Sequence, residues 1–315
     1  MAEYKQIHKV EVEKKPFTLT KKMIALLVIA IVLVVGVIAA YIVTADKDGY
    51  TSSVQNSSSK VISGDVSVTK KGLYEYLLDN YGANEVLNEA YNKITAKEIT
   101  DKDAINTKVK ELKQRYAEYS GSFETYAKNQ GYSDAKTFEK EVIVPEAKSD
   151  LLEEKYLDTK FNDVCKKYNV SYLKIVEYSK ESEALKALKT VTSADAMTAL
   201  MNANTSSSTD LGFVCSKSAT TTVDKKIIKA LSKFTSLKTD GVYKEAVKLS
   251  TGKYAVVYAY NTDKSAQKND IVKNLLNLGD VKTDIETYYL KKYKFTVEDE
   301  KVKKQIKKIS SKYVD

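Results

Sequence analysis

An uncharged, apolar run near the N-terminus, residues 23–44, constrains this chain more than any other feature. At about 1.5 Å per residue, a helix of this length crosses the roughly 30 Å hydrocarbon core of a bilayer. Lysines precede the run, whereas acidic residues follow it closely, so the N-terminal side is expected to stay in the cytoplasm. The sequence therefore predicts a cytoplasmic tail at 1–22, a transmembrane helix at 23–44 and an extracytoplasmic remainder, in a single-pass protein of the cell membrane.

A cleaved signal peptide is the alternative interpretation of the same run. Val43, Thr44 and Ala45 form an acceptable small-residue cleavage site. The run is nevertheless longer than the roughly 7–15 apolar residues of a signal peptide, which favours a retained anchor. Cleavage after Ala45 stays open. The Ser- and Asn-rich residues 45–60 that follow have little to bury and are expected to form a flexible stalk.

The charge balance argues against nucleic acid as a partner. The formal net charge is +9, but Arg115 is the only arginine and the lysines are interleaved with acids. Recognition of bases and phosphates favours the arginine fork, which this chain almost lacks. A solvated surface that faces an anionic cell envelope is the better interpretation.

Residues 61–163 show helical periodicity. Apolar residues recur every three or four positions in segments around 73–81 and 87–94, which predicts two separate helices. Ile105, Val109, Leu112 and Tyr116 form a third stripe. The side chains expected to cap helices are Thr69, Thr100, Ser133 and, near the C-terminus, Thr296. Pro145 must kink or divide the helix that follows Ser133.

Residues 164–264 change to a mixed pattern. Residues 170–178 and 211–215 are β-rich, with helical segments at 183–188, 193–202 and 225–234. Two strands at 242–249 and 254–260 are expected to form a hairpin through Thr251 and Gly252. The order of elements predicts a compact α+β domain. Residues 265–315 become helical again and are expected to pack on the first helical lobe, with the α+β domain as an insertion.

This arrangement resembles the PrsA foldases and their relative SurA, in which a helical lobe carries an inserted parvulin-type peptidyl-prolyl isomerase domain. Asp210, Leu211, Gly212 and Phe213 are similar to the parvulin DLG-plus-aromatic motif, and Thr251–Val257 resembles its last strand. Helix-starting phrases at 99–103 and 295–300 resemble those of the family. The resemblance implies a membrane-anchored extracytoplasmic foldase that binds unfolded or partly folded exported polypeptides. The alternative is a scaffolding cell-surface protein with one dedicated partner.

The chain departs from the family at the histidines that parvulins place in their first and last strands. Lys174 stands at the first position and Tyr254 at the second, and His8, before the apolar run, is the only histidine. The parvulin domain is therefore expected to be catalytically weak or inactive, and no catalytic residue is assigned. Lys174, Phe213 and Tyr254 are the residues that the resemblance implies for peptide binding.

No other chemistry is visible. The sequence has no phosphate-binding loop, no H-E-x-x-H motif and no calcium-loop spacing, so neither a cofactor nor a metal is expected. Cys165 and Cys215 lie on the extracytoplasmic side, where a disulfide is permitted. Two buried free thiols are an equally acceptable interpretation, and the sequence leaves both open.

Overall fold

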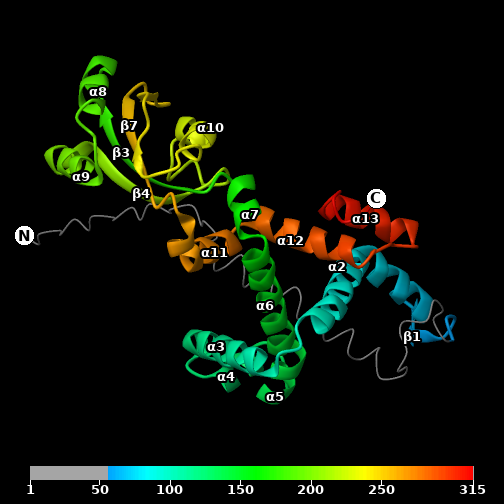
Figure 1. The fold of residues 1–315 in the computed structure, drawn as a ribbon. Helices are drawn as coiled ribbons and strands as arrows, with labels where there is room; N and C mark the ends of the chain where they lie inside the picture. The colour runs from blue at the N-terminus through cyan, green and yellow to red at the C-terminus, as the bar shows by residue number, and fades with distance from the viewer. Residues whose placement is uncertain (1–55, 315) are drawn as a thin grey trace, which may run out of the picture. The chain divides into compact units, whose positions relative to one another are not determined.

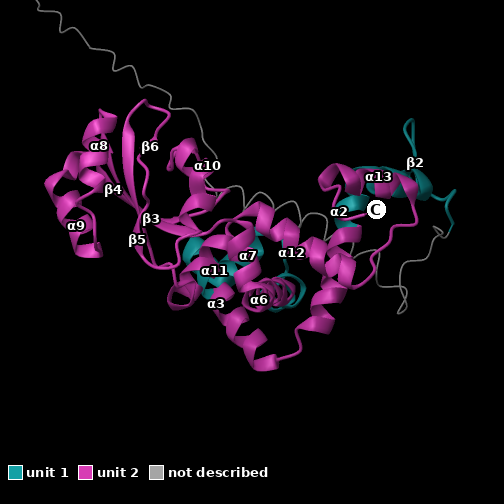
Figure 2. Ribbon diagram, turned by 45° about the horizontal axis from the view of Figure 1, so that its top comes forward, with its two compact units in different colours: residues 1–85, 114–142 teal, residues 86–113, 143–315 magenta. Residues whose placement is uncertain are grey.

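The computed structural model describes residues 56–314 and divides the chain into two compact units (Figure 2). The described part of the first comprises residues 56–85 and 114–142, and that of the second comprises 86–113 and 143–314. The fold is α+β, as the sequence predicts. The expected tail and transmembrane helix, together with residues 45–55 of the expected stalk, lie outside the described residues. Within residues 56–314 no helix has the length and apolarity to span a bilayer.

The first unit contains a small hairpin and an aromatic core. Strands β1 (Lys60–Ile62) and β2 (Val68–Thr69) pair antiparallel. Helices α4 (Phe123–Asn129) and α5 (Ala135–Phe138) enclose Phe138, whose ring centroid lies 5.0 Å from that of Tyr132 and 5.6 Å from that of Phe123. Gly121 and Gly131 both have positive φ, which ends the helices before them.

Helix α2 (Lys70–Glu98) corrects the expected pair of helices, because it runs without interruption through both predicted segments. Its start was predicted well: Thr69 Oγ1 accepts a hydrogen bond from Gly72 N at 3.0 Å. Gly82 lies between the two stripes and is buried within α2. Glycine is a weak helix former, but a single glycine does not end a helix.

Three other predicted caps are wrong by one to three residues. Helix α3 (Lys102–Ser120) is capped by Asp101, helix α5 by Asp134 and helix α13 (Glu300–Ile309) by Asp299. In each case the aspartate takes the role predicted for a nearby Thr or Ser. A carboxylate accepts the free N–H groups of a helix start and also interacts favourably with the positive end of the helix dipole.

The helical part of the second unit joins segments from both ends of the chain (Figure 1). Its later members are α6 (Val144–Thr159), α7 (Phe161–Lys167), α11 (Lys268–Leu276), α12 (Gly279–Lys292) and α13. Pro145 divides the preceding helix as predicted, because α6 begins there after a π-helical segment at Glu139–Ile143. Lys268 on α11 pairs with Asp158 on α6 at 2.7 Å.

Glu98 holds three helices of this part together. Its carboxylate accepts hydrogen bonds from Lys292 at the end of α12, from Lys155 on α6 at 3.0 Å, and from the Tyr293 hydroxyl at 2.8 Å. The hydrogen bond from Lys292 and those from the other two groups lower the pKa of Glu98 to about 2. Glu98 is therefore ionised at all ordinary pH values, and its charge is matched by its partners.

Glu153 is a second buried carboxylate in the same part, with a different environment. It is 7% exposed, and its ion pair is with Lys282 on α12, at 3.4 Å. Burial raises the pKa of Glu153 to about 7. Burial likewise raises the pKa of Glu286, which accepts a hydrogen bond from Tyr313. The buried hydroxyl of Tyr91 has no hydrogen-bond partner among the described residues.

The sheet of the second unit has the strand order β4-β3-β7-β5, with β6 also paired to β7. These strands are β3 (Ser171–Tyr178), β4 (Ser208–Val214), β5 (Gly241–Val242), β6 (Val247–Lys248) and β7 (Tyr254–Tyr260). All pairs are antiparallel. The expected strand at 242–249 is broken into β5 and β6, although both pair with β7 and Gly252 makes the predicted turn with φ +87°.

Helices cover both faces of this sheet. Leu173, Ile175 and Val257 face α10 (Lys225–Phe234), whose Ile227, Leu231 and Phe234 complete one buried core. The opposite face places Val176 and Val256 against α8 (Glu181–Leu188) and α9 (Ala194–Ala203). Alternating side chains of each strand therefore belong to different cores. The short helix η3 (Thr205–Ser207) leads into β4, and η4 (Lys264–Gln267) leads into α11.

Candidate functional site

Lys174 and Phe213, two of the predicted binding residues, lie at the same end of the sheet. Lys174 is in β3, and its partners across the ladder are Asp210 in β4 and Tyr258 in β7. Tyr172, two residues earlier and so on the same face, is opposite Phe213 and Tyr260. The side chains that gather here are called the sheet-end cluster: Tyr172, Lys174, Asp210, Phe213 and Tyr260.

Aromatic contacts form the body of the sheet-end cluster. The Tyr172 ring lies edge-on to Phe213, with centroids 6.2 Å apart, and edge-on to Tyr260, with centroids 5.6 Å apart. Such edge-to-face pairs contribute beyond the area they bury, at about 0.5–1.5 kcal/mol each. They hold three rings from three neighbouring strands in a fixed arrangement.

Charged groups surround these rings. Asp210 accepts hydrogen bonds from the Tyr260 hydroxyl at 2.7 Å and from Gly212 N at 3.0 Å. The Lys174 ammonium lies 4.0 Å from the Asp210 carboxylate and 5.1 Å from the centroid of the Tyr260 ring. The lysine thus interacts with a carboxylate and an aromatic face at once.

The DLG motif has a local structural explanation. Gly212 has φ +60°, a conformation that favours glycine, and the β3–β4 register shifts at this point. The Asp210 side chain bonds to the amide of Gly212, which fixes the irregularity in the strand. The motif therefore aims Asp210 at Tyr260 and places Phe213 beside Tyr172.

The tyrosine hydroxyls of the cluster are hydrogen-bond donors at physiological pH. Burial, together with the hydrogen bond to Asp210, raises the pKa of Tyr260. Burial and the hydrogen bond to Asp270, at the start of α11, raise the pKa of Tyr172 in the same way. Both hydroxyls stay protonated, so neither can act as a base at neutral pH.

The cluster is partly open to solvent. Tyr172 is buried, whereas Lys174, Phe213 and Tyr260 are half-buried and Asp210 is exposed. A ligand could reach two aromatic rings, one ammonium and one carboxylate. This chemistry is suited to binding a polypeptide segment by ring contacts and hydrogen bonds. With His8 the only histidine of the chain, the imidazole chemistry of a parvulin has no counterpart here.

Tyr254, the third predicted binding residue, is not brought to the cluster. It begins β7, opposite Tyr178 at the far end of β3. Tyr258 lies four positions further along the strand, which corresponds to about 13 Å. The residue of β7 that is opposite Lys174 is Tyr258. The role of Tyr254 in peptide binding stays a prediction.

Sequence reasoning missed three members of the cluster: Tyr172, Asp210 as a side chain that bonds to another strand, and Tyr260. A signal for Tyr172 was present, because Tyr172 and Lys174 are two residues apart in a strand and must share a face. Tyr260 could not be found without the register of β7 against β3.

The two cysteines are both buried and free in the structure. Cys165 is in α7, and burial raises its pKa to about 11, so its thiol is protonated at neutral pH. Cys215 directly follows β4, where its amide donates to Ser218 Oγ at 2.9 Å. Of the two interpretations that the sequence leaves open, a disulfide and two buried free thiols, neither is selected as the prediction.

No family model matches the chain, and no curated protein matches it. Solved structures do match. The chain is similar to the foldase protein PrsA from Streptococcus pneumoniae, with 19% identity over 81% of this chain and 100% of that one, at a TM-score of 0.37. It is similar to peptidylprolyl isomerase (PrsA) from Bacillus cereus, with 14% identity over 81% of this chain and 99% of that one, at a TM-score of 0.46.

PrsA from Bacillus subtilis also matches, with 18% identity over 80% of this chain and 99% of that one, at a TM-score of 0.38. These identities and TM-scores are too low to carry an argument about activity. The solved structures that match bear the name of the family, the PrsA foldases, that the sequence motifs resemble.

Proposed function

We propose that this chain is a membrane-anchored extracytoplasmic foldase that holds exported polypeptides while they fold. The observation that carries the proposal is the sheet-end cluster, which presents aromatic rings and opposite charges at one end of the parvulin-like sheet. Newly exported chains expose apolar segments and unpaired strand edges that aggregate readily. A half-open aromatic surface binds such segments weakly and releases them.

Phe213 and Tyr260 supply the apolar contact in this proposal, and Lys174 and Asp210 supply hydrogen bonds to the backbone of the client. All four are at least half-buried or fixed by a neighbour, so little side-chain entropy is lost on binding. Lys174, Phe213 and Tyr254 remain the predicted binding residues, but the cluster supports the first two more strongly than the third.

Prolyl isomerase activity is proposed to be weak or absent. Isomerisation forms no covalent bond, but its uncatalysed barrier is about 18–20 kcal/mol. The groups at the sheet end are an ammonium, a carboxylate and protonated tyrosines, and they include no imidazole. A site of this kind binds a proline-containing segment better than it accelerates rotation about the prolyl bond.

The domain organisation and the membrane anchor belong to the same proposal. The helical lobe comprises 61–163, the parvulin-like domain 164–264 and the C-terminal helices 265–315, outside the membrane. The apolar run at 23–44 tethers the chain, with 1–22 in the cytoplasm and 45–60 as the stalk. Such a tether raises the concentration of the foldase where exported chains emerge.

The test uses the full chain in a neutral detergent and measures two activities on one sample. The first is suppression of aggregation of two unrelated unfolding proteins, and the second is proline isomerisation in a short peptide. Suppression with little isomerase activity is the expected result. If one folded partner is bound and neither unfolded protein is protected, the scaffolding alternative is correct.

Variants then locate the site. Lys174→Ala with Phe213→Ala is expected to weaken aggregation suppression several-fold, and Tyr254→Ala to weaken it less. Tyr119→Ala is the matched control, since Tyr119 is 47% exposed and lies on α3, outside the sheet. Equal loss in the control and in the double variant would remove the sheet-end cluster from the proposal.

A further inference from the structure

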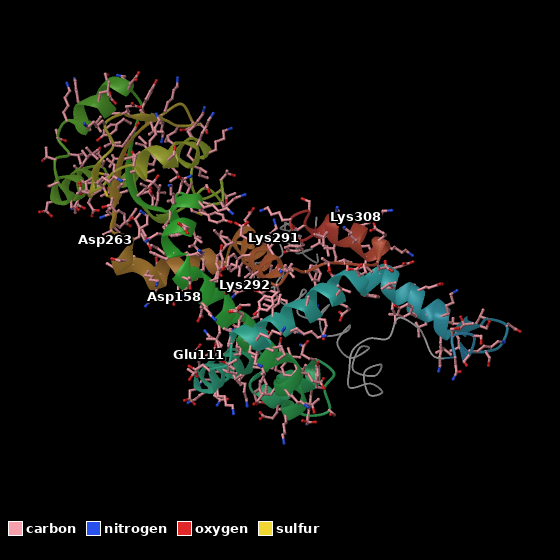
Figure 3. All side chains as sticks on the ribbon, turned by 45° about the vertical axis from the view of Figure 1, so that its right-hand side comes forward. Glu111, Asp158, Asp263, Lys291, Lys292 and Lys308 are labelled. Atoms are coloured by element: carbon pink, nitrogen blue, oxygen red, sulfur yellow. The ribbon has the colours of Figure 1, made fainter. Side chains whose placement is uncertain are left out.

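Helix α13 carries a dense group of lysines that the proposed function does not use. Lys303, Lys304, Lys307 and Lys308 lie within six consecutive residues, and none of them makes an ion pair with a described residue. Three of the four are exposed, and Lys303 is half-buried. These four residues are called the α13 lysine face, and Figure 3 labels one of them, Lys308.

Few acids lie along the chain near the α13 lysine face, and Asp315 is the first acid that follows it. Residues 301–314 include no Asp or Glu, and the last acids before them, Asp299 and Glu300, belong to the start of the helix. Elsewhere in the described structure lysines do find carboxylates, as at Lys233–Glu245 and Lys253–Glu177. Two lysines in the last turn would satisfy the helix dipole, so four exceed what the helix needs.

The apolar side of α13, opposite the lysines, is buried. Val302 and Ile306 are buried at 2% and 0% exposure, so this helix has no apolar face left to enter a bilayer. Ile309, at 49% exposure, is the one large apolar side chain that α13 exposes among its described residues. Attraction to a partner at this face must therefore be electrostatic.

The spread of the lysines around the helix indicates the shape of the partner. With about 100° between successive residues, the four side chains cover an arc of about 140° on the outer side of α13. A planar bilayer surface meets only part of such an arc, whereas a flexible chain of charges can follow it. Lysine ammonium groups act as point charges for phosphate and do not read bases as arginine does.

We propose that the α13 lysine face binds a flexible phosphate-bearing polyanion. The contact is independent of the sheet-end cluster and of client binding. Binding neutralises the four ammonium groups and releases the counterions of the polymer, so it weakens steeply as salt is added. A foldase with such a face would be retained beside an anionic polymer of its surroundings.

Helix α10 provides a matched control within the same unit. It also has ten residues and a buried apolar face, and its four lysines, against five in α13, are Lys225, Lys226, Lys229 and Lys233. Both helices are capped by an aspartate, Asp224 in α10 and Asp299 in α13, but in α10 Lys233 also pairs with Glu245 at 3.3 Å. Replacing four lysines by glutamine on either helix changes the net charge by the same amount.

The experiment titrates the full chain, in a neutral detergent, with long-chain inorganic polyphosphate at low and at moderate salt. Lys303→Gln, Lys304→Gln, Lys307→Gln and Lys308→Gln together are expected to weaken binding about tenfold or more and to flatten its salt dependence. The quadruple α10 variant should bind nearly as the parent does. Replacing the same four α13 lysines by arginine keeps the charge and should keep binding, which separates charge from damage to the helix.

Equal losses in the α13 and α10 variants would overturn the proposal, because net charge alone would then explain binding. No binding of polyphosphate by the parent chain would also overturn it. Micelles doped with phosphatidylglycerol test the bilayer alternative. If these compete with polyphosphate at matched phosphate concentration, a lipid surface and not a polymer is the partner of α13.

Discussion

The sheet and the helical part of the second unit are stabilised in different ways. The sheet comes from one continuous stretch, and its two cores consist almost entirely of apolar side chains such as Leu173, Val257 and Phe234. The helical part joins residues far apart in sequence through Glu98 and Glu153 as well as through apolar contacts. Loss of packing should therefore damage the sheet most, and loss of charge should matter in the helical part.

The two buried glutamates of the helical part also differ from each other in their partners. Glu98 has three donors, whereas Glu153 has one ion pair in a more buried place. The same residue type is thus held charged in one position and pushed toward its neutral form in the other. Their contributions to stability should respond to pH in opposite directions.

The largest expected effect is on the sheet. Leu173→Ala removes a fully buried side chain from the centre of β3 and is expected to lower the free energy of unfolding by about 3 kcal/mol. Urea unfolding followed by circular dichroism measures it. Leu185→Ala on α8, where the side chain is 41% exposed, should cost about 0.5 kcal/mol or less. Similar costs at both positions would mean that β3 is not the centre of a packed core.

Glu98→Gln is expected to cost about 2 kcal/mol at pH 7. The pKa of Glu98 is lowered to about 2 from an ordinary 4.5, so its stabilisation is complete above pH 4.5 and is lost as the pH falls toward 2. The variant should therefore match the parent near pH 2 and fall below it at neutral pH.

Glu111→Gln serves as the control for Glu98. The Glu111 side chain is 59% exposed, and its contact with Lys108 is 3.3 Å, so its loss should cost less than about 0.5 kcal/mol. Unfolding curves at pH 3, 5 and 7 measure both variants. A flat difference between parent and Glu98→Gln across this range would contradict the assigned charge state.

Glu153→Gln should change the free energy of unfolding in the opposite direction to Glu98→Gln. Because the pKa of Glu153 is raised to about 7 in the folded state, the parent loses stability as the pH rises from about 4.5 through 7. The neutral amide avoids this loss, so the variant should gain on the parent by about 2 kcal/mol above pH 7 and by little at pH 4. Thermal unfolding at pH 4, 6 and 8 tests it, and a variant that is weaker at pH 8 would refute the raised pKa.

The smallest effect is expected at the sheet-end cluster. Tyr260→Phe removes the hydrogen bond to Asp210 at 2.7 Å, but this carboxylate is exposed and can bind water in its place. The cost should be about 0.5–1 kcal/mol, against almost none for Tyr119→Phe on α3. A much larger cost in urea unfolding would mean that the cluster is part of the core and not an open site.

Local periodicity was enough to predict most elements of the sheet region. Residues 225–234 were predicted as a helix and form α10 with the same bounds, and 170–178 contains β3. These segments bury one face, and the period of that face appears directly in the sequence. The break between β5 and β6 does not appear there, because it depends on how each half pairs with β7.

The polar contacts were not predictable in the same way. Lys292 pairs with Glu98 across 194 residues. The chain has many lysines and acids, and nothing in the sequence shows which of them pair. The caps show the same difficulty at short range, since Asp101 took the position expected of Thr100. At the candidate site, Lys174 and Phe213 could be selected by motif, but their neighbour Tyr260 required the β3–β7 register.

The separation of Glu98 from Lys292 in the sequence has a consequence for the order in which the chain folds as it is made. At roughly 5–20 residues per second, Lys292 is synthesised on the order of ten to forty seconds after Glu98. The sheet, whose strands all lie between residues 171 and 260, can form during that interval. Glu98 can pair with Lys155 on α6 early, but its contacts with Lys292 and Tyr293 form only after the sheet has been synthesised. The early helix α2 therefore gains its full set of partners after the sheet can already have folded.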